Sequence, residues 1–208
     1  KEAPMGKINS ITKQTDNRYV NLYNVKATSV HNTPVNYFVA SRARDVESLK
    51  LVTRKNKPDG VIIYSIYGEN HDKVVLIRQY RYTLGDYIYE FPAGLVEPDE
   101  NYHEGAVREM YEETGLKLDP IPVAEAYQKP YFTTVGMTDE SCATVYGYAS
   151  GQISSKAQEA TEEIEVVLAD KEEVKRILQE ENVAIMTAYM LMHFLEDKEP
   201  FAFLNQIK

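Results

Sequence analysis

The sequence predicts an α+β domain, or a three-layer α/β/α one, rather than a chain of repeating βαβ units. Strand-like runs precede a single central helix, further strand-like runs follow it, and two more helical segments come only near the C-terminus. The length of 208 residues suits one domain of ordinary size with a small appended sheet.

The expected elements follow this order along the chain. Residues 18–27 and 35–41 read as a β-hairpin around a turn at 31–34. The polar, Pro-containing stretch 53–59 indicates a boundary near residue 57, between an N-terminal β subdomain (1–57) and a larger domain (58–208). In the larger domain we expect strands at 60–67, 73–82, 87–91, 121–128, 141–149 and 163–168, and helices at 102–114, 170–180 and 183–196.

Composition narrows the classes of partner. A net charge of −9 and a pI near 5.0 argue against a nucleic-acid binder or an anionic-membrane binder, since both need a basic face. Cys142 is the only cysteine, so no internal disulfide can form and a reducing compartment is expected. No run of 18 apolar residues is present, which predicts no membrane span and a cytoplasmic protein.

The central helix at 102–114 carries the strongest chemical signal. At about 100° per residue, Ala106, Val107, Met110 and Thr114 share one arc, which can face a sheet. On the opposite arc, Glu109 lies one turn from both Glu112 and Glu113, so three carboxylates crowd together. Oxygen ligands of this kind suit a hard divalent cation, Mg²⁺ or Mn²⁺, although most charged helix faces are simply solvated.

The surrounding residues favour the interpretation that these carboxylates bind metal. Residues 94–116 read GLVEPDENYHEGAVREMYEETGL and match every defined position of the Nudix box, G-x(5)-E-x(7)-R-E-U-x-E-E-x-G-U, in which U is a bulky aliphatic residue. A chance match anywhere in such a chain is on the order of 10⁻⁷. The chain therefore resembles the Nudix hydrolases, a resemblance that implies a β/α/β sandwich with a mixed central sheet between helices.

By position in the box, the resemblance implies a role for each residue. Glu109 and Glu113 would be the principal metal ligands, Glu112 a further ligand and catalytic residue, and Glu100 an accessory ligand. Arg108 would orient the glutamates by ion pairing.

The flanking residues resemble the ADP-sugar branch of the family, the ADP-ribose pyrophosphatases. The segment 78–81 (RQYR) resembles one motif of that branch, and 90–94 (EFPAG) resembles another. This implies that the Ala93 carbonyl ligates metal and that Arg81 contacts substrate phosphate, with Arg78 as a second substrate-binding candidate. The same resemblance implies a homodimer formed through the N-terminal sheet, and AMP and a sugar phosphate as products.

One departure leaves the substrate open. Val135 stands where that branch usually has a proline, in a loop (134–140, TVGMTDE) whose pattern makes Glu140 the candidate catalytic base and Asp139 the alternative. GDP-mannose, another nucleotide sugar, a dinucleotide or a nucleoside triphosphate therefore remain alternative substrates. A non-catalytic domain that senses an ADP-sugar is a further alternative, although such a domain is expected to lose the box glutamates.

Overall fold

The computed structural model describes residues 5–207, and these form two compact units. The first unit contains the residues up to Asp59 together with Pro130–Cys142, and the second contains Gly60–Lys129 and the residues from Ala143 onward. The domain boundary near residue 57 stays a prediction, and the structure groups residues 130–142 with the N-terminal side of it. No helix in the described part of the chain is long and apolar enough to cross a membrane.

The first unit is built on an antiparallel sheet of three strands in the order β1, β2, β3. The central strand β2 buries every second residue over Asn21–Val25, which is the pattern of a strand with one covered face. The buried Tyr23 hydroxyl donates a hydrogen bond of 2.6 Å to the Ala43 carbonyl. The elements of this unit are β1 (Lys7–Lys13), β2 (Asn21–Thr28), β3 (Pro34–Ser41), α1 (Lys50–Thr53) and β9 (Tyr131–Phe132).

A larger sheet forms the centre of the second unit. Its main path runs β11-β5-β4-β10-β8, with β6 paired to β5 and β7 paired to β4 beside that path. Its strands are β4 (Gly60–Tyr67), β5 (Lys73–Arg81), β6 (Asp86–Glu90), β7 (Ala93–Leu95), β8 (Lys117–Pro120), β10 (Ser141–Ser150) and β11 (Ile164–Ala169).

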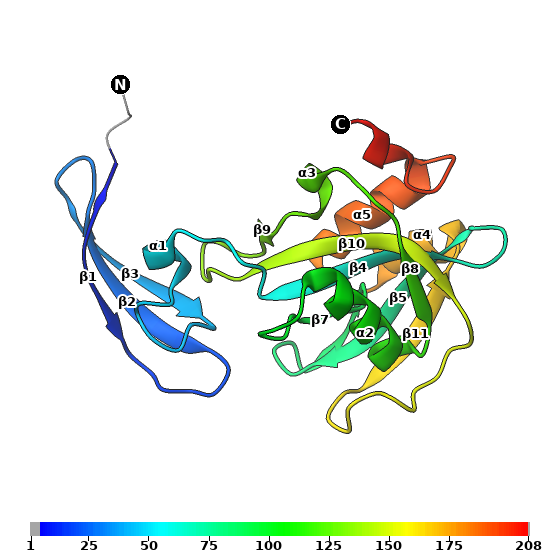
Figure 1. Ribbon diagram of the computed structural model, residues 1–208, viewed down its shortest axis with the longest axis horizontal. Coiled ribbons are helices and arrows are strands. Elements are labelled where there is room, and N and C mark those ends of the chain that lie inside the picture. The colour runs from blue at the N-terminus through cyan, green and yellow to red at the C-terminus, as the bar shows by residue number, and fades with distance from the viewer. Residues whose placement is uncertain (1–4, 208) are drawn as a thin grey trace. The chain divides into compact units, whose positions relative to one another are not determined.

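Helices cover both faces of this sheet (Figure 1). Alternate residues of β4 enter two separate apolar cores: Val61 and Ile63 pack on the side of α2 (Tyr102–Thr114). Tyr64 and Ile66 pack on the other side, with α4 (Lys171–Glu180) and α5 (Ile185–Glu196). These layers, with the small N-terminal antiparallel sheet, confirm the predicted fold class.

The predicted strand at 121–128 is wrong. The strand in this region is β8, which ends at Pro120, and the helical turn α3 (Glu125–Gln128) follows it. Pro120 and Pro122 have no amide hydrogen to donate to a neighbouring strand, which favours an early end to the pairing. The sequence analysis also missed β1, α1 and the C-terminal 3₁₀ turn Ala202–Asn205.

Candidate metal and diphosphate site

Local interactions fix both ends of helix α2. The Asn101 side chain accepts hydrogen bonds from the amides of His103 and Glu104, and the Glu104 carboxylate accepts one from the Asn101 amide. This capping box satisfies amides that the first turn leaves free. Gly115 ends the helix in the left-handed conformation (φ 75°), as predicted from the sequence.

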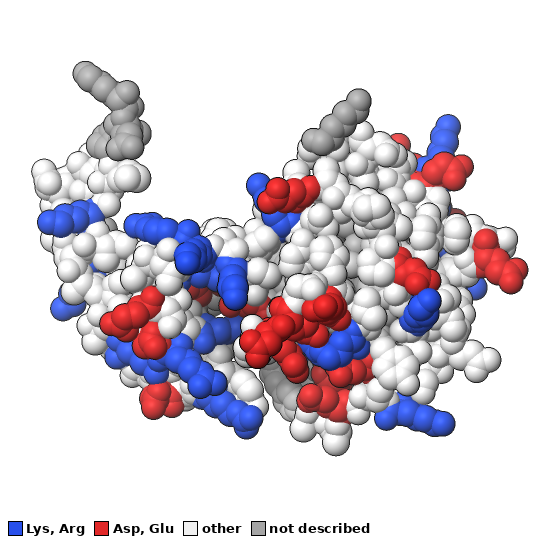
Figure 2. All heavy atoms as spheres, in the orientation of Figure 1, with Lys and Arg blue, Asp and Glu red and all other residues white. Residues whose placement is uncertain are grey.

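The packing of α2 decides which side carries the carboxylates. Ala106 and Met110 are fully buried against the sheet, so the acidic positions of the helix fall beside strand β7 and at the surface. Figure 2 shows acidic side chains gathered over α2 with a basic group among them.

Arg108 is the basic group that holds this cluster together. Its guanidinium donates to both carboxylate oxygens of Glu100 at 2.9 Å, and its Nη1 donates to Glu109 and Glu112 at 2.8 Å each. Nη2 also donates to the Leu95 carbonyl at 3.0 Å, which ties the helix to the segment that contains the box glycine. The hydrogen bonds from Arg108 lower the pKa of Glu100.

Gly94 has a steric reason to be glycine. A Cβ atom built on Gly94 would overlap the carboxylate of Glu109. The backbone of β7 and this carboxylate are therefore in direct contact, and any larger residue would displace one of them. The pKa of Glu109 is raised, mainly by burial.

Glu113 is the most deeply buried acid of the cluster, with 3% of its surface exposed. Its Oε2 accepts a hydrogen bond of 3.0 Å from the Ala93 amide. Burial raises the pKa of Glu113 well above the usual value, and the negative charges of Glu109 and Glu162 raise it further. The Ala93 contact in this structure uses its N–H, so metal ligation by its carbonyl stays a prediction.

Glu162 is a site residue that the sequence analysis did not single out. Burial raises its pKa, and the charge of Glu112 adds to this effect. Its own charge raises the pKa of both Glu109 and Glu113, so it belongs to the same electrostatic cluster. It lies in a run of acids at 162–165 (EEIE), and nothing in that run marks which glutamate faces α2.

The donor set fits a hard divalent cation. It consists of carboxylate oxygens with several negative charges held close together and partly desolvated, which only added positive charge can balance. Among residues 5–207, no three Asp, Glu, His or Cys side chains form a ready-made metal site. Arg108 takes up oxygens of Glu100, Glu109 and Glu112, so a cation would have to replace some of these contacts.

Comparison with known proteins shows the family to which the chain belongs. The NUDIX domain profile matches residues 56–190, which is most of the chain and includes β7, α2 and Glu162. The chain belongs to the Nudix family. The structure is also similar to a crystal structure of an ADP compounds hydrolase, with a TM-score of 0.69 and 16% sequence identity. The match covers 94% of each chain, which supports the same fold.

Similar Nudix sequences include an ADP-sugar pyrophosphatase of Mus musculus, 40% identical over 79 residues, which are 36% of this chain and 36% of that protein. A putative Nudix hydrolase of Caenorhabditis elegans is 34% identical over 131 residues, 58% of this chain and 57% of that protein. An ADP-ribose pyrophosphatase of Bacillus subtilis is 28% identical over 146 residues, 68% of this chain and 74% of that protein. The chain thus spans less than two thirds of the mouse and nematode proteins.

The two arginines expected to bind substrate lie on opposite faces of β5 in this Nudix fold. Val75 packs in the α2 core whereas Val74 and Leu76 pack in the other, so odd-numbered residues of β5 face α2. Arg81 is on the α2 face, where its Nε donates to Glu90 at 2.6 Å.

Arg78 is on the face away from α2. Its guanidinium stacks over the Tyr87 ring at 4.0 Å and pairs with Glu165 at 3.5 Å. Arg78 and the α2 carboxylates thus lie on opposite faces of the sheet, and substrate binding by Arg78 stays a prediction.

Glu140 and Asp139 belong to the first unit. The Glu140 carboxylate accepts hydrogen bonds from Arg42 at 2.9 and 3.0 Å and from the Thr133 hydroxyl at 3.2 Å. The Asp139 carboxylate accepts a longer one, 3.4 Å, from the Lys50 amide. The catalytic role expected of Glu140, with Asp139 as the alternative, stays a prediction, but its carboxylate already has a cationic partner.

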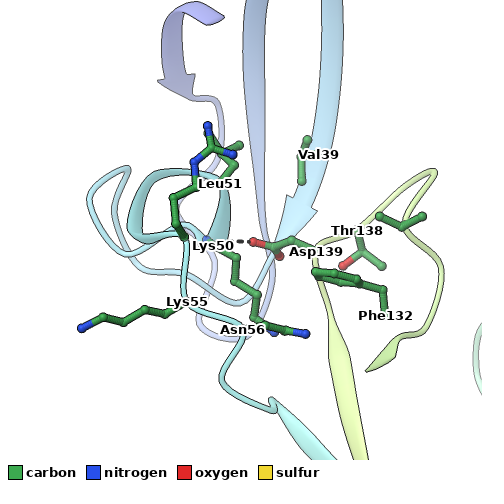
Figure 3. Close-up of a pocket in the computed structure, with 10 residues that line it drawn as sticks. Val39, Lys50, Leu51, Lys55, Asn56, Phe132, Thr138 and Asp139 are labelled. Atoms are coloured by element: carbon green, nitrogen blue, oxygen red, sulfur yellow. Dashed lines mark hydrogen bonds between the residues drawn. The ribbon is translucent and has the colours of Figure 1, made fainter. Parts of the chain in front are cut away.

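The first unit also contains a cavity of about 370 Å³ (Figure 3). Val39 and Leu51 form part of its lining, and the half-exposed ring of Phe132 forms another part. Its surface is mainly apolar, and Lys50, Arg54 and Lys55 are also among the residues that line it.

Proposed function

We propose that this Nudix protein is a Mg²⁺-dependent pyrophosphohydrolase that cleaves an ADP-sugar such as ADP-ribose into AMP and a sugar phosphate. The observation that carries the proposal is the carboxylate cluster of α2. In it, Glu113 is buried against β7 and has no cationic partner at hydrogen-bond distance among residues 5–207. The names of the mouse and B. subtilis relatives support ADP-sugars as the substrate class.

The proposed metal ligands are Glu109 and Glu113, with Glu112, Glu100 and the Ala93 carbonyl as further oxygen donors. The bound cation, Mg²⁺ or alternatively Mn²⁺, neutralises phosphate charge and lowers the pKa of the attacking water. Arg108 keeps the glutamates oriented through its hydrogen bonds to them.

The reaction itself is hydrolysis of a phosphoanhydride. The oxygen of a water molecule attacks one phosphorus, the bond from that phosphorus to the bridging oxygen breaks, and a carboxylate accepts the proton of the water. Arg81, on the α2 face, is proposed to bind a phosphate oxygen in place of, or in addition to, Glu90.

Glu162 is the carboxylate that we propose as the proton acceptor. Its raised pKa and its position in the α2 cluster suit a general base, whereas the Glu140 carboxylate is already bound by Arg42. We expect Glu162→Gln to lower kcat by about 100-fold or more with KM little changed. The matched change Glu140→Gln should leave kcat within a few-fold, and the opposite pattern would assign the proton acceptor to Glu140.

Val135 favours a second substrate class. This exposed residue replaces the proline that the ADP-ribose branch usually has, so another nucleotide sugar such as GDP-mannose is the alternative. A homodimer through the N-terminal sheet and a cytoplasmic location are also proposals.

One assay tests the activity directly. The full chain is incubated with Mg²⁺ and a panel of nucleotide sugars, dinucleotides and nucleoside triphosphates, and the nucleoside monophosphate released is quantified. The proposal expects AMP from ADP-ribose and none after chelation with EDTA. Preferential hydrolysis of GDP-mannose would replace the substrate, and no hydrolysis of any member, with Glu113→Gln indistinguishable from the parent, would leave only the sensor alternative.

A further inference from the structure

Gln79 in β5 is a buried residue whose side-chain oxygen has no hydrogen-bond partner among residues 5–207. Only 7% of its surface is exposed, and among the described residues its Oε1 accepts no hydrogen bond. An unpaired buried polar atom costs about 1–3 kcal/mol. Beside a candidate site, such an atom can be paired by a bound group.

Gln79 is an odd-numbered residue of β5, so it lies on the face of the sheet toward α2. Its partner on β11 is Ile164 and its partner on β6 is Ile88, so its flanks are apolar. Arg81 follows two residues later on the same face of β5. Glu162 precedes Ile164 by two residues, and the Arg81 charge lowers its pKa, so Gln79 lies beside the charged groups of the proposed site.

The chemistry of the unpaired atom restricts what it can bind. A carbonyl oxygen accepts a hydrogen bond, and a diphosphate ionised near neutral pH has no hydrogen to donate. The donors of a nucleotide sugar are its hydroxyls and the amino group of its base. A hydroxyl can donate to Oε1 and also accept from the amide nitrogen of Gln79, so it matches both ends of this side chain.

We propose that Gln79 determines specificity by hydrogen-bonding a hydroxyl of the sugar on the far side of the diphosphate. This inference rests on the proposed function and deepens it, because it predicts which part of the substrate is recognised. A site built around a substrate hydroxyl discriminates against analogues without it, since the buried amide then stays unpaired.

The test compares Gln79→Met with the parent on two substrates. Methionine keeps a similar length and removes the amide. One substrate is ADP-ribose, and the other is ADP carrying a methyl ester on its terminal phosphate, which retains the diphosphodiester and lacks the second sugar. We expect Gln79→Met to lower kcat/KM for ADP-ribose by about tenfold, the loss expected of one hydrogen bond, and to change kcat/KM for the methyl ester by less than twofold.

Ser65→Ala is the matched control. The Ser65 hydroxyl is also fully buried and unpaired, but it lies near the other end of the sheet, because its neighbour Ile66 pairs with Val74. Ser65→Ala should leave kcat/KM unchanged for both ADP-ribose and the methyl ester. Gln79→Met should also melt no lower than the parent, since it removes an unpaired polar group from apolar surroundings.

Each other outcome overturns the inference. Equal losses on both substrates would give Gln79 a role in water positioning or folding, and no loss on either would show that a resident water satisfies the amide. Should Gln79→Met fail to fold, the side-chain amide resonance of Gln79 in the parent protein provides the test, since ADP-ribose with an α,β-methylene bridge should shift it and the corresponding methyl ester should not. If the parent cleaves neither substrate, the proposed function fails instead.

Discussion

Glu113→Gln should make the metal-free protein more stable and the enzyme nearly inactive. The substitution keeps the shape of the side chain, and the new amide oxygen can still accept the hydrogen bond from Ala93. The substitution removes a negative charge from a residue that is only 3% exposed. It also removes the repulsion between that charge and Glu109, one helical turn away. Stability and activity should therefore move in opposite directions.

The magnitudes follow from burial and from the lost ligand charge. Removing the like-charge repulsion should raise the free energy of unfolding by a few tenths of a kcal/mol. Removing an incompletely paired buried charge should raise it by about 1 kcal/mol or more. For a chain of this size each kcal/mol raises Tm by about 2–4 °C. Loss of one charged metal ligand should lower kcat/KM by at least about 100-fold, which is about 2.7 kcal/mol of transition-state stabilisation.

The stability gain should depend on pH. Burial raises the pKa of Glu113, so the folded protein holds a proton there more tightly than the unfolded chain does. The stability from this proton is complete below the ordinary carboxyl pKa and is lost as the pH rises through the raised pKa. Glutamine does not titrate, so the Tm advantage of Glu113→Gln should be small at about pH 4 and grow toward about pH 7.

Thermal melts in EDTA and kinetics at saturating Mg²⁺ measure both effects. Glu196→Gln, at the exposed end of α5, removes the same charge from solvent and should alter neither Tm nor kcat/KM appreciably. A variant with unchanged Tm at about pH 7 would show that folding does not raise the pKa of Glu113 above its value in the unfolded chain. A kcat within a few-fold of the parent would remove Glu113 from the set of metal ligands.

Three further substitutions, with Arg78→Met as a control, test the rest of the site. Gly94→Ala should displace the Glu109 carboxylate, so the Mg²⁺ concentration for half-maximal activity should rise more than tenfold. Arg108→Lys replaces a planar fork by a point charge and should lower kcat at least tenfold, with a lower Tm in EDTA. Arg81→Met should raise KM for ADP-ribose about tenfold or more, whereas Arg78→Met on the other sheet face should leave KM within a factor of two.

The parts of the site that lie close together in sequence could be predicted from it. The α2 helix has the expected bounds, 102–114, because its apolar spacing and its terminal Gly115 are both local signals. The clustering of Glu109, Glu112 and Glu113 likewise follows from one helical turn.

What the sequence analysis missed depends on distant strands or on alternation. Glu162 joins the cluster because β11 pairs with β5, a contact between segments more than 80 residues apart that local pattern does not reveal. Arg78 and Arg81 are three positions apart on one strand, so the alternation of side chains along a strand alone puts them on opposite faces. That argument was available from the sequence, and it favours Gln79 over Arg78 as the neighbour of Arg81.

Arg108 explains how a cluster of acids can fold before any cation arrives. Its guanidinium shares its donors among Glu100, Glu109 and Glu112, and so balances the outer part of the cluster. Arg108 makes no hydrogen bond to Glu113, whose carboxylate has the Ala93 amide as its one hydrogen-bond partner in the described part of the chain. The charge left unbalanced is therefore the innermost one, and it is the position at which a divalent ion would gain most from binding. We therefore predict that the spacing of the Nudix box separates two tasks, with Arg108 stabilising the metal-free fold and Glu113 contributing metal affinity.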